Sequence, residues 1–150
     1  MNSAVILARL RRFLLVVSAL FFAGTLLELW LIGHMEDFVQ WLPFVLCGLG
    51  LVAILGALVR PRRAAAVGLR VVMGVVALGS LFGVYEHVAN NLAFHREIYP
   101  NAPASDSLMS ALGGANPLLA PGIMAAAAVL AIAATYHHPA LRSGDDELNG

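Results

Sequence analysis

The chain has 150 residues, of which 60% are hydrophobic and 12% are charged, and its formal net charge is zero. Soluble domains carry about 25% charged residues, so this composition excludes an ordinary soluble domain. The neutral charge balance gives no indication of a nucleic-acid partner, and the single cysteine, Cys47, excludes a disulfide within the chain.

Four apolar stretches, each close to the length of a membrane-spanning helix, account for most of the chain. A helix needs about 20 residues to cross about 30 Å of hydrocarbon. The stretches lie at Phe13–Gly33, Trp41–Val59, Ala66–Ala89 and Pro117–Tyr136. We therefore predict an all-α fold, a four-transmembrane-helix bundle in a lipid bilayer, which forms a single domain over residues 1–142.

The N-terminal region has some features of a secretory signal peptide, because three arginines precede an apolar run. The apolar run continues as far as Gly33, however, and no convincing cleavage site follows it. We predict a retained signal anchor, with residues 1–12 forming a short amphipathic entry to the first span. At the other end of the chain, the polar tail over residues 143–150 is predicted to be disordered.

The distribution of arginines predicts the orientation in the membrane. Eight of the nine arginines fall on one side of the predicted spans, and only Arg96 falls on the other. Cytoplasmic loops of membrane proteins carry the excess of basic residues. We predict a multi-pass protein of the bacterial inner membrane with both termini cytoplasmic, so that Gly33–Gln40 and Asn90–Asn116 are extracytoplasmic.

Prolines and other helix-breaking residues predict how the spans are connected. Pro61 marks a tight turn, so the second and third spans should form an antiparallel hairpin. The third span contains no strong breaker before Pro100, and its helix should continue beyond the membrane surface. A short helix at Ser105–Leu112 is predicted to lie flat on the outer surface.

Small residues and aromatic residues mark where the spans should pack and where they should end. Gly79 and Gly83 form a GxxxG pair, which allows close contact either within the bundle or between copies of the protein. Trp30, Trp41 and Tyr85 lie near the predicted outer boundary, where aromatic side chains anchor membrane proteins.

Polar side chains gather at the predicted extracytoplasmic end. Glu28 lies about 7 Å below the predicted end of the first span, and Glu86 lies at a similar depth in the third. Carboxylates inside a span are costly and usually face protein or a wet cavity. The other members of the cluster come from the first outer loop and the extension of the third span: His34, Glu36, His87 and Asn91.

Helix spacing limits what this cluster can bind. His87, Asn91 and His95 share one helix face, but the two histidines are about 12 Å apart along the axis and cannot chelate the same ion. A metal would need a composite site built from two helix ends. Carboxylate and imidazole ligands suit zinc, iron, copper or manganese. One hypothesis is therefore a divalent metal cofactor held by six residues: Glu28, His34, Glu36, Glu86, His87 and Asn91. The alternative is that these side chains form a hydrogen-bond network that ties the loop to the helix.

Two segments of the chain, GHMEDFVQWLPF at Gly33–Phe44 and GVYEHVANNLAFHRE at Gly83–Glu97, carry a resemblance to known proteins. With these segments, the chain resembles a group of small bacterial four-span membrane proteins of uncharacterised function. The resemblance covers nearly the whole chain. It implies the same topology and draws attention to the same outer cluster, but it implies no activity.

Three classes of function fit these observations. The leading hypothesis is a non-enzymatic accessory or scaffold subunit, in a homo-oligomer or a larger membrane complex, because the spans are rich in Gly and Ala and no catalytic motif is present. The alternative is a protein that binds a divalent cation or a proton through the outer cluster, for transport or sensing. A membrane redox or quinone-linked enzyme has the weakest support, because the histidines lie at the edges of the spans and not inside them.

Overall fold

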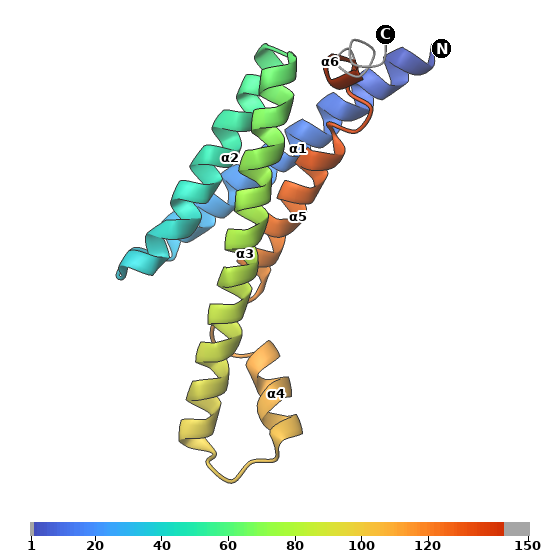
Figure 1. Ribbon diagram of the computed structural model, residues 1–150. Helices are drawn as coiled ribbons and strands as arrows, with labels where there is room; N and C mark the ends of the chain where they lie inside the picture. The colour runs from blue at the N-terminus through green and yellow to red at the C-terminus, as the bar shows by residue number, and fades with distance from the viewer. Residues whose placement is uncertain (1, 143–150) are drawn as a thin grey trace.

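A computed structural model describes residues 2–142 of the chain, except for the side chain of Arg142. Over these residues the chain is all-α, with helices and turns and no strand. Figure 1 shows a bundle from which one long helix projects. The tail over residues 143–150, for which disorder is predicted, lies outside the described residues.

The first helix, α1 (Ser3–Leu31), begins well before the predicted start of the first span. The Asn2 side chain accepts a hydrogen bond from the backbone N–H of Ala4 at 3.1 Å, which caps the helix. No breaker follows, so the predicted entry to the first span is helical and continuous with it as the first part of α1. The helix ends before Gly33, whose φ of 66° is a left-handed conformation that favours glycine.

The middle of the chain forms the predicted antiparallel hairpin. A short 3-10 turn, η1 (Phe38–Trp41), leads into α2 (Leu42–Val59), which has a proline in its first turn. Helix α3 (Arg63–Ile98) follows a tight turn and has 36 residues, so it is about 54 Å long. It stops two residues before Pro100, which confirms that the helix of the third span continues well beyond residue 89.

The last third of the chain differs from the sequence-based expectation in two ways. Helix α4 (Ala104–Leu112) packs along the projecting part of α3 and runs antiparallel to it, so it does not lie flat across the end of the bundle (Figure 1). Helix α5 (Leu119–Ala133) has only 15 residues, about 22 Å, and is shorter than the apolar stretch that contains it. Among the described helices, α1, η1 with α2, and α3 are long and apolar enough to span a membrane.

Helix α5 ends early because tight turns replace its last helical hydrogen bonds. Thr135 N–H donates to the carbonyl of Ile132, and His137 adopts a φ of 49°. Pro139 then begins the short helix α6 (Pro139–Arg142). A left-handed residue followed shortly by proline is a common way for a helix to stop.

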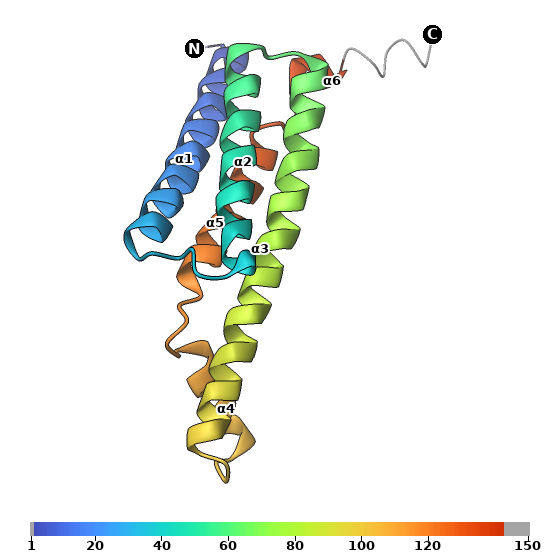
Figure 2. The same cartoon turned by 90° about the vertical axis from the view of Figure 1, so that its left-hand side faces the viewer.

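The four long helices form an up-down-up-down bundle. Helix α1 packs on α2 and α5, and α3 packs on the same two helices, so α1 and α3 lie on opposite corners (Figure 2). The start of α1, the α2–α3 turn and α6 lie at one end, which we call the arginine end, at the top of both views. The opposite end, where α1 stops and α2 begins, is called the acidic end.

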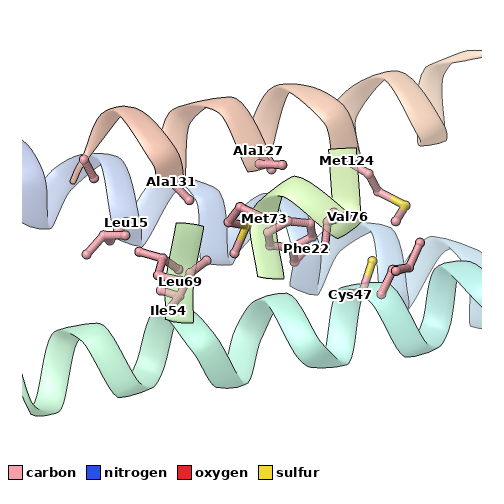
Figure 3. Packing of buried hydrophobic residues seen from close by; sticks show 13 residues of the cluster. Leu15, Phe22, Cys47, Ile54, Leu69, Met73, Val76, Met124, Ala127 and Ala131 are labelled. Carbon is pink, nitrogen blue, oxygen red and sulfur yellow. The ribbon is translucent and has the colours of Figure 1, made fainter. Parts of the chain in front are cut away.

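Close packing in the core depends on small residues opposite larger ones. Figure 3 shows Phe22, Met73 and Val76 against Ala127 and neighbouring alanines of α5, all fully buried. The absence of side chains on certain glycines makes this packing possible, because close helix contact needs small residues.

The two glycines of the GxxxG pair are both used inside the bundle. A Cβ atom at Gly79 would overlap the Leu46 side chain of α2, and one at Gly83 would lie 3.3 Å from Pro121 of α5. Contact within the bundle, one of the two alternatives that the sequence leaves open, is therefore present, whereas contact between copies stays a prediction.

Replacing Gly79 by valine is expected to lower the free energy of unfolding by about 1–3 kcal/mol, because the added methyl groups overpack the contact with Leu46. Gly74→Val on the same helix is the matched control, since a Cβ there meets no atom within 4 Å. Both variants change helix propensity equally. Thermal unfolding in detergent measures the difference, and equal melting temperatures for the two variants would contradict the assignment.

Candidate functional site

A cavity of about 260 Å³ lies at the acidic end, between α1, α2, α3 and the start of α5. Its wall is mostly apolar, with a few polar groups. The polar side chains that line it are those of Glu28, His34, Ser80, His87 and Asn116.

Three of the six residues predicted for the composite site line this cavity, and each comes from a different segment. Glu28 belongs to the last turn of α1, His34 to the loop that follows, and His87 to α3. The loop brings His34 back over the helix end, where its backbone N–H bonds to the carbonyl of Leu29 at 3.0 Å. The structure therefore brings two imidazoles and one carboxylate to one apolar cavity.

A backbone contact fixes the orientation of His87 and its neutral tautomer. Nδ1 of His87 lies 2.7 Å from the carbonyl oxygen of Pro117. A carbonyl oxygen can only accept, so the proton of the neutral ring resides on Nδ1, and Nε2 keeps its lone pair. Nε2 is thus available to accept a proton or to bind a cation.

The second imidazole, His34, lies in an environment that disfavours its charged form. Burial of the ring is the main cause that lowers the pKa of His34 below its ordinary value, and the nearby His87 lowers it further. Positive charge at His87 therefore makes protonation of His34 less favourable.

Asn91, by contrast, is fully used in holding the structure together. Its side chain is only 4% exposed. The amide Nδ2 donates to the carbonyls of Ala111 and Asn116 at 3.0 and 2.9 Å. Its Oδ1 accepts from the backbone and side-chain N–H groups of Asn116 at 2.9 and 3.1 Å. With both donors and both acceptor positions engaged, Asn91 ties α3 to the end of α4 and the following loop.

The remaining two predicted residues lie outside the cavity wall. Glu36 is exposed, and its backbone N–H bonds to Gln40 Oε1 at 2.7 Å, which orders the loop. Glu86 is half-buried on α3. Between residues 2 and 142 no group of three or more His, Cys, Asp or Glu side chains is arranged to hold a metal ion. A divalent metal at this end therefore stays a prediction.

Sequence reasoning missed the residues that complete the cavity, for two different reasons. Ser80 and Gly83 precede His87 by seven and four positions, so one helix face of α3 contains all three, and this spacing was a usable signal. Asn116 and Pro117 arrive from an irregular loop whose path is set by the contacts of α4. No periodicity in the sequence indicates that placement.

At the arginine end, two arginines hold the backbone where α5 unwinds. Arg70 Nε donates to Thr135 Oγ1 at 2.7 Å, and its Nη2 donates to the Thr135 carbonyl at 3.2 Å. Arg11 Nη2 donates to the carbonyls of Tyr136 and His137. These bonds satisfy carbonyls that a helix end leaves without partners.

Comparisons of the chain with models of protein families, with curated proteins and with solved structures give no match.

The Asn91 contacts give a prediction for the outer loop. Asn91→Ala removes four hydrogen bonds and leaves buried carbonyl and N–H groups unpaired, so the segment over residues 101–118 should open more often. We expect proteinase K to cleave this segment at least about tenfold faster than in the parent protein. Asn90→Ala is the control, because that neighbouring side chain is exposed. If both variants are cleaved at the parental rate, Asn91 does not hold the loop.

Proposed function

We propose that the protein is a small multi-pass protein of the bacterial inner membrane that binds a proton in its extracytoplasmic cavity and thereby senses acidity. The proposal includes four membrane crossings, both termini in the cytoplasm and no enzymatic step. The main support for this proposal is that Glu28, His34 and His87 line the same cavity.

The proposed topology is supported by the up-down-up-down arrangement. The start of α1 and the segment after α5 lie together, since Arg11 bonds to the carbonyls of Tyr136 and His137. Chain segments that meet at one end of a bundle lie on the same side of a membrane. The excess of arginine at this end supports a cytoplasmic location for it.

Labelling of introduced cysteines in intact spheroplasts tests this topology. With Cys47 replaced by alanine, Ser105→Cys should react with a thiol reagent that cannot cross the membrane, because its segment is extracytoplasmic. Ser3→Cys and Ser143→Cys should react only after lysis. Labelling of Ser143→Cys in intact spheroplasts would mean that α5 does not cross the membrane.

The chemistry of the cavity favours proton binding. His87 Nε2 has a free lone pair, and burial lowers the pKa of His34 below its ordinary value. Glu28 contributes a carboxyl group to the same apolar cavity, so the two rings share it with a third polar group from α1. When His34 gains a proton, the cost of a charge in the apolar cavity favours movement of its loop away from α3.

The direction in which the pKa of His34 is shifted determines how the stability of the protein depends on pH. The pKa of His34 in the folded protein lies below the ordinary value of about 6.5. Between these two pKa values the unfolded chain binds more protons, so the free energy of unfolding falls as the pH drops below about 6.5. This loss of stability is complete once the pH lies below the pKa that His34 has in the folded protein.

Tryptophan fluorescence provides the measurement, since Trp30 and Trp41, the only tryptophans, flank the loop of His34. In the purified full chain we expect a reversible change in emission centred below pH 6.5. His34→Gln should abolish it. His87→Gln should move the midpoint upward, because the repulsion that lowers the pKa of His34 is removed.

The control for this experiment is Glu36→Gln, which alters the same loop but does not alter the cavity wall. It should leave the midpoint unchanged. An identical transition in His34→Gln and in the parent protein would rule out proton sensing at this site.

An accessory or scaffold role, as a homo-oligomer or in a larger complex, has less support from the residues described above. The GxxxG pair that would favour contact between copies is occupied by Leu46 and Pro121 of the same chain. Such a role stays a prediction that does not conflict with proton sensing.

A further inference from the structure

A second cavity, of about 350 Å³, lies at the arginine end and is separate from the proposed sensing site. It is formed by the first half of α1, the α2–α3 turn and the segment between α5 and α6, which meet at the top of Figures 1 and 2. None of its lining residues in the described part of the chain is acidic.

The cavity combines positive charge with an apolar wall. Its basic lining consists of Arg11, Arg12, Arg62 and His138. The rest of the wall is mainly aliphatic and includes Leu15, Leu58 and Leu69. A ligand that fits both parts has an anionic group joined to a hydrocarbon portion.

One of these arginines is held in place and still has an unused donor. Arg11 bonds through Nη2 to the carbonyls of Tyr136 and His137, which fixes the plane of its guanidinium group. Its Nε is buried and has no hydrogen-bond partner among the described residues. Arg11 also lines the cavity, and a phosphate oxygen is an acceptor that a guanidinium group binds well.

The electrostatic field in this cavity is visible at His138. Burial of the ring lowers the pKa of His138, and the charges of Arg11 and Arg70 lower it further. The positive charges of Arg11 and Arg70 thus act on the ring of His138, and a bound anion would offset them.

We propose that this cavity binds the phosphate headgroup of an anionic phospholipid, with the acyl chains lying along its aliphatic wall. Basic pockets between helices on the cytoplasmic side of membrane proteins bind such headgroups. The aliphatic wall, at one end of membrane-length helices, favours a lipid over free phosphate. The inference goes beyond proton sensing and rests only on membrane embedding, so lipid binding and the pH response can fail independently.

Lipid titration of the purified full chain in a neutral detergent tests this site. Phosphatidylglycerol should raise the melting temperature in a saturable manner, whereas phosphatidylcholine and inorganic phosphate at equal concentration should not. The double variant Arg12→Gln/Arg62→Gln should weaken the apparent affinity for phosphatidylglycerol on the order of thirtyfold, because two cation–phosphate contacts are lost. Arg11 is left intact because it also holds the end of α5.

The matched control is Arg9→Gln/Arg60→Gln, which removes the same charge from the same end but from residues that do not line the cavity. It should retain affinity within about threefold, since solvent and salt screen charges that lie outside the cavity. Equal losses in the two double variants would mean that only general surface charge attracts the lipid, which overturns the proposal. If the cavity variant fails to fold, the single changes Arg12→Gln and Arg62→Gln are titrated separately against Arg9→Gln.

The acids Asp145, Asp146 and Glu147 follow α6 closely in the sequence and offer a competing anion. A full chain with these residues changed to Asn, Asn and Gln addresses this competition. The proposal expects phosphatidylglycerol binding with and without the changes. If phosphatidylglycerol binds only after these acids are neutralised, the tail occupies the cavity. If inorganic phosphate raises the melting temperature as much as the lipid does, the cavity is a site for free anions. Either result overturns the proposal.

Discussion

The close approach of α5 to its neighbours is the contact on which the rest of the molecule depends. Lipid is as apolar as the side chains of a helix, so helices in a bilayer associate through tight packing and hydrogen bonds. Ala127, Ala128 and Ala131 are fully buried against the other helices, and their small size allows the backbones to come close. This packing brings each end of α5 against side chains of α1 or α3, namely His87 at one end and Arg11 and Arg70 at the other.

Both cavities form where α5 gives way to irregular backbone. At the acidic end the carbonyl of Pro117 fixes the ring of His87, and at the arginine end the carbonyls beyond α5 fix Arg11. Backbone carbonyls without helical partners need donors, and at these two places the donors are also the residues with chemical capacity. The same contacts that complete the short helix therefore orient the groups that we propose to bind a proton and a lipid phosphate.

The sequence predicts the helical class and the membrane-length segments well, because apolar length is a property of each segment alone. It predicts the continuation of α3 for the same reason, since no breaker precedes Pro100. The early end of α5 and the contact between α4 and α3 depend on tertiary partners, and apolar length does not reveal them. Within the site, the sequence indicates Glu28 from its depth in the first span, and His34 and His87 from the first outer loop and the end of the third span. The structural role of Asn91 depends on a loop whose path is set only by folding.

The short length of α5 also affects the surrounding lipid. Its outward face, which includes Leu119 and Val129 at 66% and 60% exposure, is only about 22 Å tall, beside helices of at least full bilayer length. In the four-span arrangement that we propose, a bilayer about 30 Å thick has a hydrophobic mismatch on this side of the protein. Local thinning of the lipid or tilting of the bundle would relieve the mismatch, so we propose that the protein distorts the membrane asymmetrically and favours a thinner region or a neighbour that causes a similar distortion.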